Sequence, residues 1–137
     1  MRRVIVGVVA AMFYLSTALA GTASAHSFVD HPHLTIHKSP AGATAPGDAV
    51  VVYGKLKSDH FLCRFNQPVR LWVVRPGNDK FLDSDKTDRQ GEYSFTRHPH
   101  RDRTFYTRFP GFFESSYGHS HRCVKDRSSD LLIDVTS

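Results

Sequence analysis

Short segments in which apolar and polar residues alternate follow one another along most of this chain, separated by residues typical of turns. The segment from Asp48 to Lys57, for example, carries Val50, Val52 and Leu56 on one side. Alternation with a period of two is typical of a β-strand with one buried face, whereas a helix needs a period of 3.6. Because no helical period is sustained after the first 25 residues, the pattern predicts an all-β protein.

The spacing of these segments favours two packed antiparallel sheets. We expect about seven short strands in about 110 residues, which is typical of a sandwich. Parallel strands would need helical connections, and the pattern contains none. The expected strands are Leu34–Ile36, Asp48–Lys57, Val69–Val74, Phe81–Thr87, Glu92–Thr96, Thr104–Phe109 and Ser129–Thr136.

The N-terminal stretch has the three regions of a secretory signal peptide. Arg2 and Arg3 precede an apolar run from Val4 to Leu15, and a segment of small residues ending at Ala25 follows. Cleavage is expected after Ala25, and a second small-residue site would place it after Ala20. An uncleaved anchor is the alternative, but the apolar run is shorter than the roughly 20 residues that span a bilayer.

These features predict the domain organisation and the location. Residues 1–25 are the expected signal peptide, 26–33 a flexible N-terminal lead and 34–137 one sandwich domain. After cleavage no membrane span is expected. We therefore predict a secreted or extracytoplasmic protein, either free or associated with the cell wall.

Two cysteines in an exported chain indicate a disulfide. Cys63 and Cys123 would close a loop of about 60 residues, which stabilises a folded domain by roughly 4 kcal/mol in the chain-entropy description. The bond would tie the long connection after Phe109 to the segment before the Val69 strand.

Composition and motifs exclude several classes of function. The chain has 137 residues, enough for one domain, and its net charge of +5 includes two arginines of the leader. This mild excess argues against a nucleic-acid-binding protein. The sequence lacks a Gly-x-Ser-x-Gly turn, a phosphate-binding glycine loop and a clear pair of catalytic carboxylates. We therefore do not expect an enzyme.

Several turn and strand motifs carry a resemblance to a known group. They include the Pro46-Gly47-Asp48 entry to a Val-rich strand, the turn and strand from Thr87 to Phe95, and the two cysteines. With them, residues 34–135 resemble the immunoglobulin-like β-sandwich modules of secreted and surface bacterial proteins, which overlap in appearance with transthyretin-like and carboxypeptidase-regulatory-like domains. The resemblance implies a binding, spacing or envelope-associated role without catalysis. The high histidine content departs from this group.

One connection, between Phe109 and Ser129, is unusually long, and loops of this length are usually functional or disordered. Its Phe112, Phe113 and Tyr117 could form an exposed aromatic platform for a sugar or a partner protein. The alternative is that these rings cover the end of the core. The expected partner is an unknown protein or a cell-wall polymer.

Histidines provide a second candidate site. His119 and His121 form one of three His-x-His pairs, and in an extended chain such a pair points to one side. His60, His119 and His121 would lie near the disulfide, and reduced thiols in place of that bond would complete a zinc site. Cleavage after Ala25 would add an α-amine to His26, a pair of donors that chelates copper, as in the histidine brace. The alternative is that these histidines are solvated loop residues.

A third feature is the basic cluster from Arg97 to Arg103, which holds three arginines and two histidines. It could attract anionic wall polymers, phosphates or lipid head groups. The alternative is a solvated loop.

From these observations we predict a small secreted, non-enzymatic binding or envelope-associated protein without a required cofactor. The alternative is an extracytoplasmic copper- or zinc-binding protein that uses His26, His60, His119 and His121.

Overall fold

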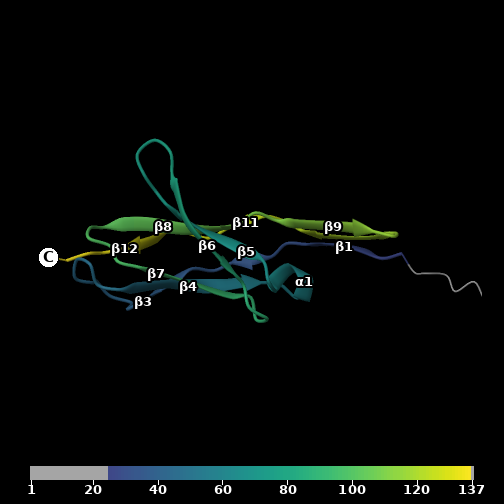
Figure 1. Cartoon of the computed structure of the whole chain (residues 1–137), viewed down its shortest axis with the longest axis horizontal. Helices are drawn as coiled ribbons and strands as arrows, with labels where there is room; N and C mark the ends of the chain where they lie inside the picture. The colour runs from purple at the N-terminus through teal and green to yellow at the C-terminus, as the bar shows by residue number, and fades with distance from the viewer. Residues whose placement is uncertain (1–24, 137) are drawn as a thin grey trace, which may run out of the picture.

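The computed structural model describes residues 25–136, which form β-strands and one short helix (Figure 1). The prediction of an all-β protein is confirmed. Residues 1–24, which hold most of the expected signal peptide, lie outside the described residues. No helix of residues 25–136 has both the length and the apolar character needed to cross a bilayer. The elements are β1 (Ser27–Asp30), β2 (His33–Leu34), β3 (His37–Ser39), β4 (Val50–Lys57), α1 (Phe61–Arg64), β5 (Pro68–Val73), β6 (Lys80–Lys86), β7 (Glu92–Arg97), β8 (Arg103–Phe109), β9 (Phe112–Ser116), β10 (His119–Cys123), β11 (Asp126–Arg127) and β12 (Leu131–Ile133).

Two antiparallel sheets form the body of the molecule. In one sheet β4 is central and pairs with β2, β3 and β7. The other has the order β11-β8-β5-β6, and β12 also pairs with β8. The sheets lie face to face, as in a β-sandwich, and enclose one hydrophobic core (Figure 1).

Alternation along the central strands places one side of each in this core. Val50, Val52 and Leu56 of β4 are fully buried, as are Val69 and Leu71 of β5. The intervening side chains of these strands are half-buried or exposed. The faces predicted from the period of two are therefore confirmed, and Tyr93, Phe95, Phe105, Phe109 and Ile133 complete the core from both sheets.

A buried tyrosine joins the two sheets. The Tyr93 hydroxyl of β7 donates to the Thr35 carbonyl and lies 3.0 Å from Oγ1 of Thr107 on β8. Burial raises the pKa of Tyr93 to about 12. Gly54 makes this contact possible, because a Cβ there would lie 1.9 Å from the Thr35 oxygen and 2.7 Å from the Tyr93 hydroxyl.

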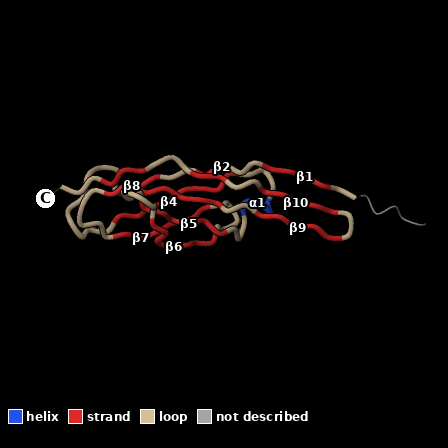
Figure 2. The backbone as a smooth tube through the Cα atoms, turned by 90° about the horizontal axis from the view of Figure 1, so that it is seen from above, coloured by secondary structure: helices blue, strands red, loops and turns tan. Residues whose placement is uncertain are grey.

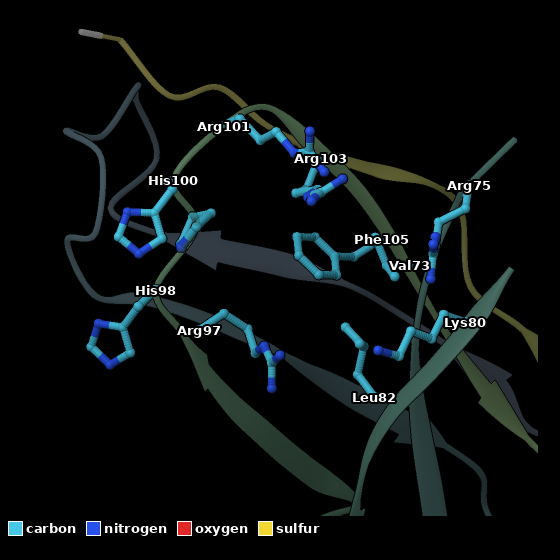
Figure 3. A pocket seen from close by; sticks show the side chains of 11 residues that line it. Val73, Arg75, Lys80, Leu82, Arg97, His98, His100, Arg101, Arg103 and Phe105 are labelled. Atoms are coloured by element: carbon cyan, nitrogen blue, oxygen red, sulfur yellow. The ribbon is translucent and has the colours of Figure 1, made fainter.

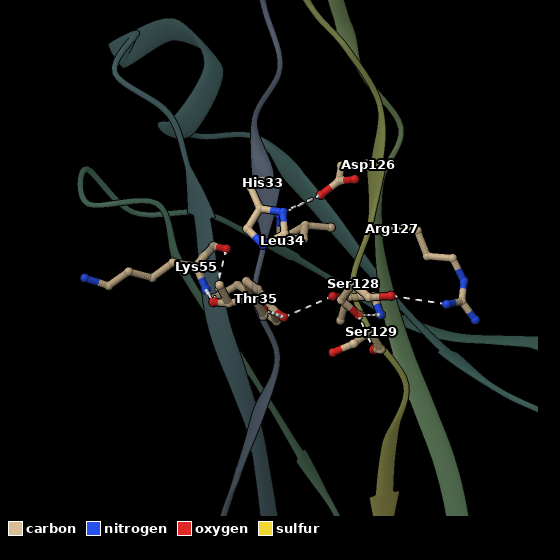
Figure 4. A network of polar contacts seen from close by, with 10 residues as sticks. His33, Leu34, Thr35, Lys55, Asp126, Arg127, Ser128 and Ser129 are labelled. Atoms are coloured by element: carbon tan, nitrogen blue, oxygen red, sulfur yellow. Dashed lines mark hydrogen bonds and ion pairs between the residues drawn. The ribbon is translucent and has the colours of Figure 1, made fainter.

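A second polar connection links the sheets near the N-terminus. The backbone N–H of Leu34 in β2 donates to Oδ2 of Asp126 in β11 at 2.8 Å, and the His33 ring lies 3.5 Å from the same oxygen (Figure 4). Because Leu34 is buried, its N–H needs such an acceptor. Asp126 therefore ties the edge of one sheet to the other.

The expected disulfide is present between Cys63 and Cys123, with a Cα–Cα distance of 5.5 Å. It connects α1 to the last residue of β10, and both cysteines are buried. The bond thus joins the body to the long connection that follows β8, as the sequence predicted.

The connection itself differs from the expectation of a loop. Residues 112–123 form a hairpin in which β9 and β10 pair from Phe112↔Cys123 to Ser116↔His119. The N-terminal lead also differs, because Ser27–Asp30 forms β1 and pairs in parallel with β10. We call the sheet with the order β1-β10-β9 the projecting sheet, because it extends beyond the sandwich at the end that carries α1 (Figure 2). Pairing with β10 satisfies the backbone N–H and C=O groups of β1. In an unpaired N-terminal segment these groups would form hydrogen bonds with water.

Candidate binding surface on the projecting sheet

The register of the projecting sheet assigns its side chains to two faces, since residues paired across strands point the same way. Phe28 of β1 pairs with His121 of β10, which pairs with Glu114 of β9. Because His119 and His121 are two residues apart, both lie on this side, which we call the histidine face. The opposite side, which we call the open face, carries Val29, Arg122 and Phe113 in one row and Ser27, Ser120 and Ser115 in the next row of the same face.

Two apolar side chains of the open face are exposed to solvent. The side chain of Val29 is 61% exposed and that of Phe113 is 66% exposed. Tyr117, in the turn between β9 and β10, is 100% exposed and has a positive φ of 45°. Exposed aromatic side chains are enriched in binding surfaces.

Of the three aromatic residues predicted as a platform, the structure brings two to solvent and separates the third. Phe113 and Tyr117 are exposed, but Phe112 is half-buried and packs against the core. Phe112 pairs with Cys123, so its ring lies at the base of the projecting sheet. Phe112 therefore covers the end of the core, whereas Phe113 of the same strand is exposed.

The outer edge of β9 is unpaired among the described residues. In the sheet order β1-β10-β9, only β10 pairs with β9. Natural edge strands are usually protected by charges, proline or bulges, and β9 carries one charge, Glu114. This edge can accept a strand from another polypeptide.

On the histidine face, three imidazoles come together from distant parts of the sequence. Nδ1 of His26 lies 2.8 Å from Nδ1 of His119, and Nε2 of His26 lies 3.2 Å from Nε2 of His121. The remaining ring nitrogen of His121 is buried without a hydrogen-bond partner. The period of two predicted that His119 and His121 share a side, but only the parallel pairing of β1 brings His26 between them.

His60 is separated from these rings by Phe28. The Phe28 ring stacks on His60 with a centroid distance of 3.9 Å and on His121 at 4.6 Å. His60 therefore packs against the histidine face instead of joining its nitrogen contacts. This aromatic stack also holds β1 against the segment that leads into α1.

In this structure the imidazoles of His26, His119 and His121 are not arranged as a metal centre. Among residues 25–136, no group of three or more His, Cys, Asp or Glu side chains is arranged to hold a metal ion. The reason is geometric, since the two nitrogens of His26 lie on opposite sides of its ring and each faces a different histidine. A zinc site with two thiolates is excluded as well, because Cys63 and Cys123 are bonded to each other.

Comparison with known proteins adds no relative. No protein-family model matches the chain, and no curated protein has a matching sequence. The resemblance to immunoglobulin-like modules therefore depends on the strands and turns of this chain alone.

Proposed function

We propose that this protein is an exported, non-enzymatic binding protein with an immunoglobulin-like sandwich, and that it binds a protein partner at the cell envelope through the projecting sheet. The observation that carries the proposal is the exposure of Phe113 and Tyr117 on a sheet that leaves the sandwich. The signal-like N-terminus and the disulfide support export.

A polypeptide partner fits this surface better than a sugar polymer does. The free edge of β9 offers backbone donors and acceptors for an added strand, and Phe113 lies beside this edge. A carbohydrate would use the aromatic rings but not the strand edge. The projecting sheet is small, with strands of four or five residues, so we expect a weak or transient complex.

The proposal is tested by binding of the purified mature protein to source cells. We expect the Phe113→Ala/Tyr117→Ala variant to lose at least tenfold in affinity, because exposed aromatic side chains commonly dominate such interfaces. Phe81→Ala is the matched control, since Phe81 is 46% exposed on β6 of the sandwich. Cells stripped by protease serve as the second arm.

Loss of binding in the double variant and on stripped cells, with Phe81→Ala unchanged, supports the proposal. Unchanged binding by the folded double variant contradicts the assignment of the surface. Full binding to stripped cells contradicts the protein partner and indicates a wall polymer.

A second candidate function is copper binding at the exposed end of the histidine face. The specific observation is the 2.8 Å approach of Nδ1 of His119 to Nδ1 of His26. Cleavage after Ala25 would turn the backbone nitrogen of His26 into an amine, which together with Nδ1 chelates Cu²⁺. His119 would supply a third nitrogen, and imidazole is a favourable copper ligand.

Calorimetric titration with Cu²⁺ tests this candidate with a built-in control. Protein that begins at His26 is expected to bind tightly, and protein that begins at Gly21, as cleavage after Ala20 would produce, is expected to bind at least a hundredfold more weakly. His119→Ala should weaken binding, whereas His37→Ala, on β3 of the sandwich, should not. Absence of binding below about 100 μM by the His26 form contradicts copper binding.

A further inference from the structure

A basic cavity lies at the end of the sandwich opposite the projecting sheet. Its volume is about 460 Å³, within the range of small-molecule sites. It opens where the strand pair β5 and β6 meets the connection between β7 and β8. We call it the basic pocket and define it by its five cationic residues, Arg75, Lys80, Arg97, Arg101 and Arg103, and its apolar floor of Val73, Leu82 and Phe105.

Two sheets contribute the positive charges. Arg75 follows β5 and Lys80 begins β6, while Arg97 ends β7 and Arg103 begins β8. Figure 3 shows these side chains around the Phe105 ring, with His98 and His100 at the outer rim. The sequence indicated only the cluster from Arg97 to Arg103, and the fold adds two cations from a distant hairpin.

None of the five cationic side chains takes part in an ion pair or donates a hydrogen bond within residues 25–136. The neighbouring carboxylates are occupied elsewhere. Asp79 accepts from the Tyr106 hydroxyl at 2.8 Å, and Asp102 accepts from the Val135 backbone N–H at 2.8 Å. The lining of the cavity contains no Asp or Glu. Cations gathered without ion-pair partners repel each other, and a bound anion reduces this repulsion.

The floor of the cavity is apolar. Val73 and Phe105 are buried in the core, and Leu82 packs against it. Leu82 is the partly exposed residue of this floor, and an inorganic ion would leave it in contact with water, whereas a ligand with an apolar group would cover it. Guanidinium groups suit phosphate oxygens, since they donate two parallel hydrogen bonds.

From these contacts we infer that the basic pocket is a binding site for a phosphate monoester that carries an apolar group. The phosphate would lie among the arginines and the apolar group against Phe105 and Leu82. The inference is independent of the projecting sheet, because the β7–β8 connection that lines the pocket lies at the other end of the molecule from β9 and β10 (Figure 2).

The test is calorimetric titration of the oxidised protein at low ionic strength with phenyl phosphate, with inorganic phosphate and benzyl alcohol as the two partial ligands. We expect phenyl phosphate to bind at least tenfold more tightly than inorganic phosphate, and benzyl alcohol not to bind. The Arg97→Gln/Arg103→Gln variant should lose at least tenfold in affinity. Arg70→Gln is the control, because Arg70 is an exposed arginine of β5 outside the cavity.

A sedimentation assay with vesicles that contain phosphatidic acid distinguishes a lipid from a soluble ester. Sedimentation that depends on Arg97 and Arg103, without phenyl phosphate binding, assigns the pocket to a lipid phosphate. Thermal unfolding of each variant verifies that it is folded. Failure of both phenyl phosphate and the vesicles to bind overturns the inference, as does equal weakening by Arg70→Gln.

Discussion

The sandwich and the projecting sheet adjoin along the chain, yet their aromatic side chains lie in opposite surroundings. In β8 the side chains of Phe105 and Phe109 enter the core. Four residues after β8 ends, on β9, Phe113 is two-thirds exposed. The sandwich therefore supplies the burial that stabilises the fold, and the projecting sheet holds exposed side chains at low cost to that stability.

Few contacts join the sandwich to the projecting sheet. These contacts determine how strongly the stability of one region depends on the other. The disulfide and the stack of Phe28 between His60 and His121 lie at the junction. Substitutions at the junction should therefore alter stability, whereas substitutions on the projecting sheet should alter binding.

Removal of the disulfide should have the largest effect. The Cys63→Ser/Cys123→Ser variant is expected to lose about 4 kcal/mol, because the 60-residue separation gives the unfolded chain more entropy when the bond is absent. Denaturant titration of both proteins measures the change. A loss below about 1 kcal/mol would mean that the junction does not depend on this bond.

Ionisation of Tyr93 should produce the next largest effect, at alkaline pH. An unfolded tyrosine ionises near pH 10, and the folded pKa is about 12, so the folded state holds its proton more tightly. The stability of the folded state should be complete below pH 10 and fall by about 3 kcal/mol as the pH approaches 12.

The Tyr93→Phe variant provides the control for that profile. At neutral pH it should lose about 1–3 kcal/mol, because Thr35 and Thr107 lose a buried hydrogen-bond partner. Between pH 10 and 12 it should lack the part of the decline that Tyr93 causes. Denaturant titrations at several pH values measure both effects, and identical slopes in the two proteins would contradict the assignment to Tyr93.

Asp126→Ala should cost about 2 kcal/mol, since the buried N–H of Leu34 would lose a charged acceptor. Asp130→Ala is the comparison, because Asp130 forms only an exposed pair with Arg127 and should cost less than about 1 kcal/mol. Thermal unfolding distinguishes them. Equal losses would indicate that Asp126 does not join the sheets.

The smallest effect on stability is expected for Phe113→Ala/Tyr117→Ala, within about 0.5 kcal/mol of the unmodified protein, since exposed side chains away from special contacts contribute little. Denaturant titration checks this value beside the cell-binding assay. A loss of more than about 2 kcal/mol would show that these rings stabilise the fold.

The sequence predicted those parts of the molecule in which one side of a strand is buried. Val50, Val52 and Leu56 alternate because one face of β4 meets the core, so their faces could be read from the period of two. The pairing of Cys63 with Cys123 followed from their being the only cysteines.

The projecting sheet could not be predicted in the same way. Residues 112–116 alternate between two accessible faces, so hydrophobicity leaves no strand signal there. The pairing of β1 with β10 joins residues 93 positions apart, and no local pattern records it. For this reason the sequence indicated the separate histidines but not the contact of His26 with His119 and His121. The sequence indicated only the part of the basic pocket that lies between Arg97 and Arg103, because Arg75 and Lys80 join it only when the chain folds.

Amide hydrogen exchange of the free, oxidised protein tests most directly whether the sandwich stabilises the fold and the projecting sheet is held beside it. We expect amides of β4 and β8 to exchange only by global unfolding, and those of residues 113–121 to exchange earlier through local opening, since β9 is exposed on both of its faces after Phe112. Equal protection of the two regions would contradict this division of the molecule.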